Sequence, residues 1–401
     1  MMTALNSEVR VTGFWAAREA LRHRDLRQGL YDEGSALMSS VIVNLHGPAH
    51  TLRRRLENRL FRRETFRHWE AVLIPLSIRA SIATHVNDGS VDLIDVARDT
   101  MMRIAADIAG IDLGELPQRF ALLREIMADL AQASTVRHYT GDKTQAIVRG
   151  QAALQTFDDE FFAVAHTRRR SLIAEVAAGR QAPDSLPRDV LSTLLLNQDN
   201  LDVPLEDIRR EIAYFPWVGS HSTSTAFVNL MDHVFAWIDA RPDDLHQLIE
   251  DAAWLQDFAF ESLRLHPASP FAERVALADV TLADSTFIPS GSRVVIEMQS
   301  ANCDTSVFGM DAAEFKPRRR LPDDVSAWGL SFGSGFHACL GQEVAAGIEP
   351  DGGAEVHLYG AMATMAQLLL RRGARRDPDH PAVRDESSVR RHFRSYPVLL
   401  D

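Results

Sequence analysis

A short glycine-rich segment around one of the chain's two cysteines constrains the fold more than any other feature. Residues 330–343 read LSFGSGFHACLGQE, so two phenylalanines, three glycines and a histidine surround Cys339. Glycines allow a backbone to approach another surface closely. The segment therefore predicts a loop that presents the Cys339 thiol to a partner group.

Several chemistries use a cysteine in such a loop. A nucleophile elbow requires Gly-x-Cys-x-Gly, and His337 occupies the first glycine position. A zinc site requires more ligands at short spacing than His337 supplies, since Cys303 is isolated. Residues 333–338 match the dinucleotide pattern G-x-G-x-x-A, but about sixty residues follow, too few for the repeated strand–helix units of that fold. A buried structural cysteine and a haem thiolate remain.

A haem thiolate would use every part of this segment. Glycines let the backbone approach the flat ring, and backbone N–H groups can point at the sulfur. The pattern Phe332-x-x-Gly335-x-His337-x-Cys339-x-Gly341 closely resembles the haem-binding loop of the cytochrome P450 superfamily. The resemblance implies that Cys339 is the metal ligand of haem b (iron protoporphyrin IX), with Phe332 packed on the ring and His337 on a propionate.

Further family motifs occur in the same order. Glu261-Ser-Leu-Arg264 resembles the Glu-x-x-Arg helix, and residues 315–319 resemble the Phe-x-Pro-x-Arg segment. The resemblance implies a buried network of Glu261, Arg264 and either Arg319 or Arg318. The alternative is a surface i,i+3 pair, worth a few tenths of a kcal/mol. Residues 301–308 resemble another family stretch, with Cys303 where arginine is common.

Residues 50–54 resemble the family's His-Thr-x-x-Arg helix, which implies that His50 and Arg54 contact haem propionates, as Arg274 would from its own segment. Residues 50–67 hold seven arginines against two glutamates in a chain of net charge −12. The alternative for these arginines is a solvated basic helix face, and both interpretations can hold together. The Arg53–Arg67 face suits an acidic electron donor such as a ferredoxin with its reductase.

The oxygen-activation segment departs from the family. Residues 218–223 align with Ala/Gly-Gly-x-Asp/Glu-Thr, so Gly219 leaves room above the iron, His221 replaces the acid and Ser222 the threonine. Ser222 or Thr223 can hold a proton chain, and His221 can shuttle protons near neutral pH. The alternative is that His221 points away and water delivers the protons.

Helical periodicity dominates the first 270 residues, and short β-prone runs follow between Ala268 and Ile296. A helix is expected from about residue 204 to about residue 240, interrupted at Pro216. The prediction is a mainly α protein with a minor β-sheet region, by resemblance one cytochrome P450 domain over residues 1–401. Because His50 comes early, the N-terminal part is expected to be shortened. Residues 349–355 resemble an insertion in the helix after the cysteine loop.

Composition limits the remaining classes. The chain has 401 residues, 46% of them apolar and 24% charged. Two cysteines exclude a disulfide scaffold and favour the cytoplasm. The acidic net charge argues against nucleic-acid binding, and the N-terminus has no uninterrupted apolar run for a membrane anchor.

The family resemblance implies a monooxygenase of secondary metabolism that inserts one oxygen atom from O2 into a small-to-medium apolar substrate. Its electrons would come from NAD(P)H through a ferredoxin-type partner. Substrate contacts are expected from residues 35–44, 217–222 and 268–271, and near Phe393. Two alternatives stay open: atypical chemistry (peroxide-driven, coupling, rearrangement or dehydration), and a non-catalytic haem-binding accessory protein.

Overall fold

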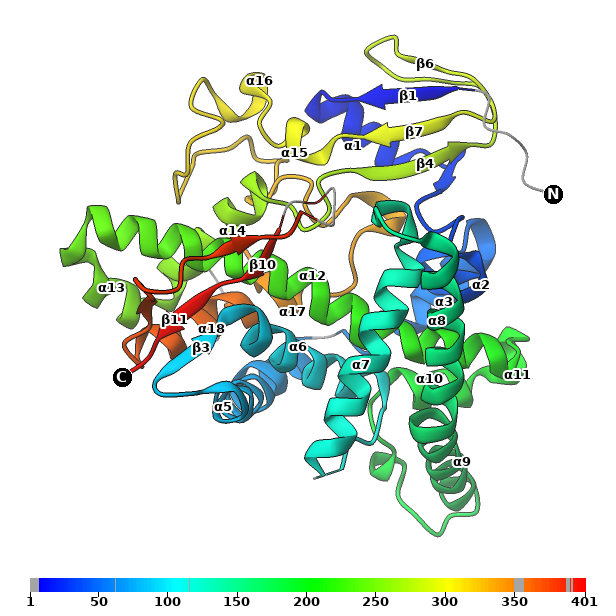
Figure 1. The fold of residues 1–401 in the computed structure, drawn as a ribbon. Helices are drawn as coiled ribbons and strands as arrows, with labels where there is room; N and C mark the ends of the chain where they lie inside the picture. The colour runs from blue at the N-terminus through cyan, green and yellow to red at the C-terminus, as the bar shows by residue number, and fades with distance from the viewer. Residues whose placement is uncertain (1–6, 62, 115, 350–356, 387–389, 391) are drawn as a thin grey trace.

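The computed structural model describes residues 7–61, 63–114, 116–349, 357–386, 390 and 392–401. Helices form most of it. The strands of the described residues form four small sheets, and the largest, with four strands, lies beside the helical part (Figure 1). This arrangement confirms the predicted mainly α fold with a minor β region.

The helices differ widely in length. Their bounds are α1 Phe14–Arg22, α2 Ser35–Met38, α3 Gly47–Glu57, α4 Arg63–His68, α5 Ile74–His85, α6 Leu93–Ala109, α7 Pro117–Ser134, α8 Lys143–Phe157, α9 Ala163–Ala177, α10 Val190–Leu196, α11 Gln198–Leu201, α12 Leu205–Ala240, α13 Leu245–Glu250, α14 Ala252–Leu265, α15 Met298–Ala301, α16 Thr305–Phe308, α17 Gln342–Ala346 and α18 Gly360–Leu370. Single π-helical turns join α4 to α5 and α8 to α9.

The strands are short. Their bounds are β1 Glu8–Val11, β2 Leu26–Gln28, β3 Ser90–Asp92, β4 Ala272–Ala276, β5 Val280–Thr281, β6 Phe287–Ile288, β7 Arg293–Ile296, β8 Arg375–Arg376, β9 Val383–Arg384, β10 Phe393–Ser395 and β11 Pro397–Leu399. The main sheet has the order β1-β7-β4-β2, with β1 parallel to β7 and the other pairs antiparallel. Its β2–β4 register sets Gln28 opposite Arg274, which places that arginine for the site described below.

Helix α12 runs unbroken through Pro216, so the predicted interruption there is wrong. Proline removes one helical N–H, but the turns on both sides remain packed along α6. The Ser220 hydroxyl also donates to the Pro216 carbonyl at 2.6 Å. The helix begins after Pro204 with Glu206 and Asp207 in its first turn, which suits the positive end of the helix dipole.

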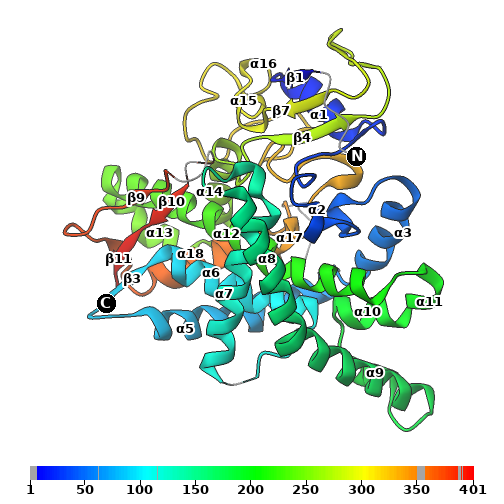
Figure 2. The same cartoon turned by 45° about the vertical axis from the view of Figure 1, so that its right-hand side comes forward.

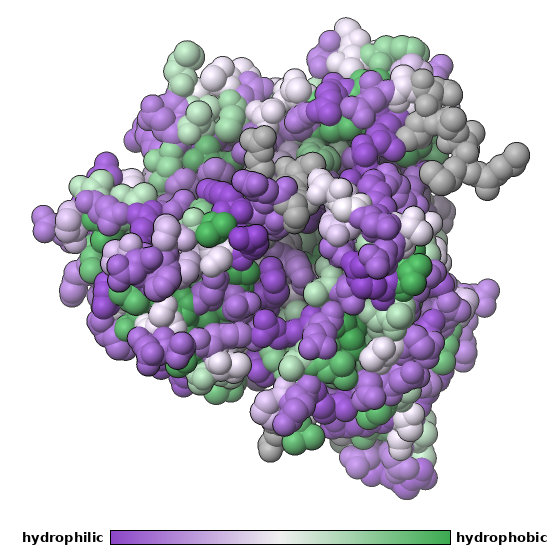
Figure 3. Space-filling model, viewed as in Figure 1, coloured by the Kyte–Doolittle hydropathy of each residue, from purple (hydrophilic) through white to green (hydrophobic). Residues whose placement is uncertain are grey.

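Two apolar clusters hold these layers together. The larger one joins α5, α6, α7, α12, α14 and α18, and the smaller one lies between the main sheet and α1. Figure 2 shows α9 projecting from the helical part, away from the sheet. The face in Figure 3 is mostly hydrophilic, with small scattered apolar areas. Among the described helices, none is long and apolar enough to span a bilayer.

Candidate active site

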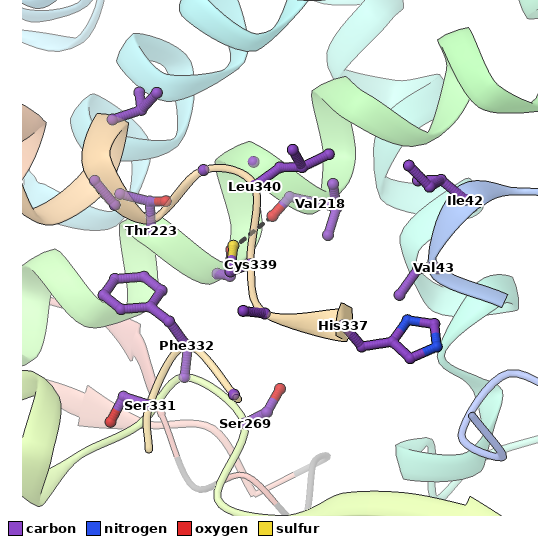
Figure 4. A pocket seen from close by; sticks show the side chains of 18 of the residues that line it. Ile42, Val43, Val218, Thr223, Ser269, Ser331, Phe332, His337, Cys339 and Leu340 are labelled. Atoms are coloured by element: carbon purple, nitrogen blue, oxygen red, sulfur yellow. Dashed lines mark hydrogen bonds between the residues drawn. The ribbon is translucent and has the colours of Figure 1, made fainter. Parts of the chain in front are cut away.

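A cavity of about 310 Å³ separates the cysteine loop from α12. Figure 4 shows the Cys339 sulfur beside α12, with Phe332 and Ser331 on one side and His337 on the other. The wall is mostly apolar, with side chains that include Leu30, Ile42, Val43, Phe61, Met101, Ile104, Ile108, Phe215, Val218, Phe271, Met298 and Met362. Such a lining is typical of a pocket for a largely apolar ligand.

The loop holds Cys339 by its own backbone. The Cys339 N–H donates to the Phe332 carbonyl at 2.8 Å. Gly333 has φ 72° and Gly335 has φ 74°, left-handed values that favour glycine. The N–H groups of Gly341 and Gln342 donate to the sulfur and stabilise a thiolate, although burial raises the pKa of the thiol overall. A metal ion bound to the sulfur would deprotonate it.

A buried ion network stands behind the loop. Both carboxylate oxygens of Glu261 accept hydrogen bonds from Arg264 at 2.7 Å, and these side chains are almost fully buried. Arg319 joins them, donating to Glu261 at 3.2 Å. Arg318 instead turns outward and donates to Asp257. Of the two arginines left open by the sequence, Arg319 is therefore the one in contact with Glu261.

Asn302 connects this network to the cysteine loop. The Arg264 guanidinium donates to the Asn302 carbonyl at 2.6 Å, and the Asn302 amide donates back to the Arg264 carbonyl at 2.9 Å. The Asn302 side-chain oxygen accepts from the Leu330 N–H at 2.7 Å, where the loop begins. A Cβ on Gly329, which has φ 61°, would lie 2.3 Å from that oxygen. Glycine is thus required at this approach.

Cationic and imidazole groups line one end of the cavity. His50 and His337 lie with ring centroids 4.1 Å apart, and Arg54 and Arg274 line the wall nearby. Arg54 also donates to the Ala338 carbonyl at 2.6 Å. Burial first, then the neighbouring positive groups, lowers the pKa of His337 to about 3 and of His50 to about 4.

This end of the cavity fits the anionic edge of a haem. Arg274 Nε and His337 Nε2 are buried and have no hydrogen-bond partner among the described residues. Buried donors without acceptors are costly, and two propionates would supply the acceptors. With the Cys339 sulfur at the cavity surface as well, the donor set matches a haem held by sulfur on its face and by cations at its edge.

Across the cavity, α12 presents only part of the predicted relay. Gly219, Ser222 and Thr223 line the wall, whereas His221 does not. His221 Nδ1 instead donates to the Trp217 carbonyl at 2.9 Å. Burial, with Arg98 next, lowers the pKa of His221 to about 3, so the ring is neutral at neutral pH. A proton role for His221 stays a prediction, and the structure places its ring outside the cavity.

Some of the remaining expected site residues reach the cavity wall and others do not. Gly335 lies beside the cavity lining, where a Cβ would meet Arg22 Cγ at 2.9 Å. Of the expected substrate segments, residues 42–43, 218–219, 222, 268–269 and 271 reach the wall, while Phe393 is absent from it. The expected insertion at 349–355 lies almost entirely outside the described residues. Its described neighbours end α17 at Ala346 and begin α18 at Gly360.

Sequence reasoning missed three groups near the cavity. Tyr31 and Tyr214 line the wall, and no motif marks them. Arg53, assigned to a surface docking face, is 4% exposed and pairs with buried Glu211 at 2.9 Å, so it cannot belong to that face. The spacing was the available signal, since His50, Arg53 and Arg54 share one helical face at i, i+3 and i+4.

Comparisons with known proteins agree with this geometry. The family profile "Cytochrome P450" matches residues 239–347. The chain is 25% identical over 340 residues to cyclooctat-9-en-7-ol 5-monooxygenase of Streptomyces melanosporofaciens, covering 79% of this chain and 71% of the relative. It is 38% identical over 105 residues to cytochrome P450 130 of Mycobacterium tuberculosis, covering 26% of this chain and 24% of the relative.

Solved structures share the fold over nearly the whole chain. CalO2 superposes with a TM-score of 0.73 at 18% identity, covering 98% of this chain and 90% of that one. P450BioI, in a complex with a fatty-acyl carrier protein, superposes with a TM-score of 0.72 at 20% sequence identity, covering 98% of this chain and 91% of that one. Fold, cysteine loop and motif order define a haem-thiolate oxygenase. The chain belongs to the cytochrome P450 superfamily, in its bacterial type.

Proposed function

We propose that this monooxygenase binds haem b through Cys339 and inserts one oxygen atom from O2 into a small-to-medium apolar organic molecule. The observation that carries the proposal is the sulfur of Cys339 facing α12 across an apolar cavity, with N–H groups from Gly341 and Gln342 directed at it. Bound haem would supply the activation of O2, with one oxygen atom entering the substrate and the other leaving as water.

The chain's own residues set the conditions for that reaction. Gly219 lies in the α12 wall, where a Cβ would come within 3.1 Å of the Ala105 Cβ, which also lines the cavity. Ser222 donates its hydroxyl hydrogen to the Val218 carbonyl at 2.6 Å, so its oxygen lone pairs remain available to accept a proton from the cavity. The apolar lining excludes water and strengthens the polar interactions that remain.

Electrons would arrive from NAD(P)H through a ferredoxin-type protein, at the surface formed by α3 and α4. Arg55 on α3, Arg59 just after that helix and Arg67 on α4 are exposed there. Helix α3 contacts the cysteine loop directly, through Arg54 and Ala338. An acidic donor would therefore find complementary charge close to the proposed haem. Both cysteines are unpaired, which suits a cytoplasmic location.

The substrate class rests on the wall of the cavity. Its apolar side chains suit a hydrocarbon-rich molecule, and its few hydroxyls would orient one. The Streptomyces relative is named for its action on cyclooctat-9-en-7-ol. That name supports a largely apolar organic substrate and a place in secondary metabolism for this chain as well.

The absorption spectrum of the reduced, CO-bound protein tests this function. Wild type should show the red-shifted Soret band of a thiolate ligand, and Cys339→Ser should lose it. Cys303→Ser is the matched control, because Cys303 is a free cysteine outside the cavity. A wild-type spectrum without the shift, or a shift that persists in Cys339→Ser, contradicts the proposal.

The orientation of His221 favours a second candidate, oxidation driven by hydrogen peroxide. Peroxide brings its own protons, so an acid beside Ser222 is not needed. Turnover with peroxide alone would support this candidate. Turnover that requires O2, NAD(P)H and an electron-transfer protein would reject it.

A further inference from the structure

Three charged side chains from α3 and α12 are buried together. Arg53 is 4% exposed, and Glu57 and Glu211 are 0% exposed. Arg53 Nη1 donates to Glu211 Oε2 at 2.9 Å, and the same oxygen accepts from the Ile42 N–H at 2.8 Å. Burying such a cluster costs free energy unless its charges compensate one another.

The hydrogen-bond donors around this cluster do not satisfy both carboxylates. Both oxygens of Glu57 and the Oε1 atom of Glu211 are buried and have no donor among the described residues. Two adjacent buried carboxylates cannot both be ionised at modest cost. One shared proton removes the repulsion and supplies a donor for an otherwise orphaned oxygen.

The charges facing the pair agree with a retained proton. Burial, reinforced by Glu211, raises the pKa of Glu57 well above its usual value, and Arg53 and Arg54 oppose this only in part. Burial likewise raises the pKa of Glu211, although Arg53 and the Ile42 N–H lower it, and Asp207 adds a small further rise. Tyr214 also faces the pair from α12: burial raises the pKa of its hydroxyl, and both carboxylates add to that rise.

The pair lies directly behind the cavity wall. Ile42 and Arg54, which touch or neighbour the carboxylates, both line the cavity. Tyr214 lies three residues after Glu211 on α12, a spacing that places the two side chains next to each other. The Tyr214 side chain lines the cavity, and its hydroxyl makes no hydrogen bond within the described part of the chain. Tyr214 thus stands between the carboxyl pair and the cavity.

The usual proton source is missing on the other part of α12. His221, which occupies the expected acid position, bonds to the Trp217 carbonyl and does not line the cavity. The Ser222 hydrogen is engaged by the Val218 carbonyl. A monooxygenase consumes protons together with electrons, so the cavity needs another acid.

We propose that Glu57 and Glu211 hold one proton between them and supply it to the cavity through the Tyr214 hydroxyl. In this step Tyr214 Oη accepts the proton from the carboxyl pair and releases its own to a basic oxygen in the cavity. The carboxyl pair loses one proton in this step and takes up another from solvent water. No electrons move in this relay. The inference rests on the proposed function, which supplies the proton demand.

Infrared spectroscopy tests the shared proton without turnover. Wild-type protein with 13C-carboxyl glutamate should show, at neutral pH, the C=O stretching band of a buried protonated carboxylic acid. Glu57→Gln should remove it, and this variant should fold because the amide resembles the neutral acid. Glu206→Gln, an exposed carboxylate on α12, is the control and should leave the band. Absence of the band, or its persistence in Glu57→Gln, would overturn the shared proton.

Oxygen consumption tests the relay. Haem-loaded protein would be supplied with NADPH, a surrogate ferredoxin and its reductase. Glu57→Gln and Tyr214→Phe should each slow oxygen consumption by about tenfold or more at neutral pH, and should flatten its dependence on pH. Wild-type rates and pH profiles in both variants would overturn the route.

Two further comparisons keep the test specific. Glu57→Asp, which retains a carboxyl group, should recover part of the pH dependence, whereas a merely structural role would predict no such rescue. Only preparations with the thiolate CO spectrum enter the comparison. Failure of the relay is therefore distinguishable from failure of the proposed function, which would appear in that spectrum first.

Discussion

The two walls of the cavity are held in different ways. On the cysteine side, side chains from three separate segments meet: Glu261 and Arg264 from α14, Asn302, and Arg319. On the α12 side, Ser220, His221 and Ser222 donate to carbonyls of their own helix four residues earlier. Long-range contacts thus fix the cysteine loop, while the polar groups of α12 are satisfied locally.

The comparison explains where the sequence is free to vary. Changing one member of the cysteine-side network leaves buried charge behind and disturbs the loop it supports. Changing a hydroxyl or imidazole on α12 leaves only a helix carbonyl that keeps its own helical N–H. The relay residues can therefore differ from the family pattern while the cysteine loop matches it.

The largest expected effect breaks the cysteine-side network. Arg264→Ala should lower the free energy of unfolding by about 3–5 kcal/mol, because Glu261 is left buried with only part of its charge compensated. Arg318→Ala is the control: its side chain is 56% exposed and pairs with Asp257, so the loss should stay below about 1 kcal/mol. Urea unfolding of both variants measures the difference. Equal losses would show that the loop does not depend on buried charge.

A pH titration of stability tests the local arrangement on α12. The pKa of His221 is about 3 in the folded chain and near 6.5 when unfolded. The unfolded state therefore takes up a proton that the folded state refuses. The stabilising contribution of neutral His221 is complete above about pH 6.5 and is lost progressively as the pH falls toward about 3.

His221→Gln should remove this loss. When the pH is lowered from neutral to about 5, the free energy of unfolding should fall by about 1–2 kcal/mol more in the wild type than in the variant. His246→Gln provides the control, because His246 is exposed and its substitution should leave the wild-type slope unchanged. Urea unfolding across this pH range measures how the free energy of unfolding of each protein depends on pH. Parallel slopes for wild type and His221→Gln would mean that His221 charges freely in the folded state.

A smaller effect should separate Ser222 from its neighbour. Ser222→Ala removes a hydroxyl from the cavity wall. The fraction of consumed oxygen that is released as hydrogen peroxide should therefore rise about threefold or more. His221→Ala should change that fraction by less than about twofold, since its ring lies off the wall. Peroxide and oxygen electrodes give the ratio directly. A larger change in His221→Ala would place the proton path on the other face of α12.

The cysteine loop and its network could be predicted because they are short motifs at fixed spacing. The spacing of His50, Arg53 and Glu57 indicates one shared face of α3, but the burial of that face could not be predicted, because a hydrophobicity pattern treats these polar residues as exposed. Their burial depends on Glu211, which is distant in the sequence.

Other features depended on tertiary contacts as well. The continuity of α12 through Pro216 depends on packing along α6, which outweighs the local preference. Tyr31 and Tyr214 reach the cavity from separate elements and form no pattern. The sequence therefore predicted the ligand side of the site well, and predicted which α12 residues face the cavity only in part.

The smallest effect concerns the outer surface of the cysteine side. Arg55→Ser, Arg59→Ser and Arg67→Ser should each raise the KM for an acidic ferredoxin about twofold to threefold, more at low salt, because exposed charges are screened and individually weak. The kcat should not change, since none of these arginines lines the cavity. Arg180→Ser, beyond the end of α9, is the control and should leave the KM unchanged. If the control raises the KM as much as these three variants do, the donor responds to overall charge, and the α3–α4 surface holds no docking face.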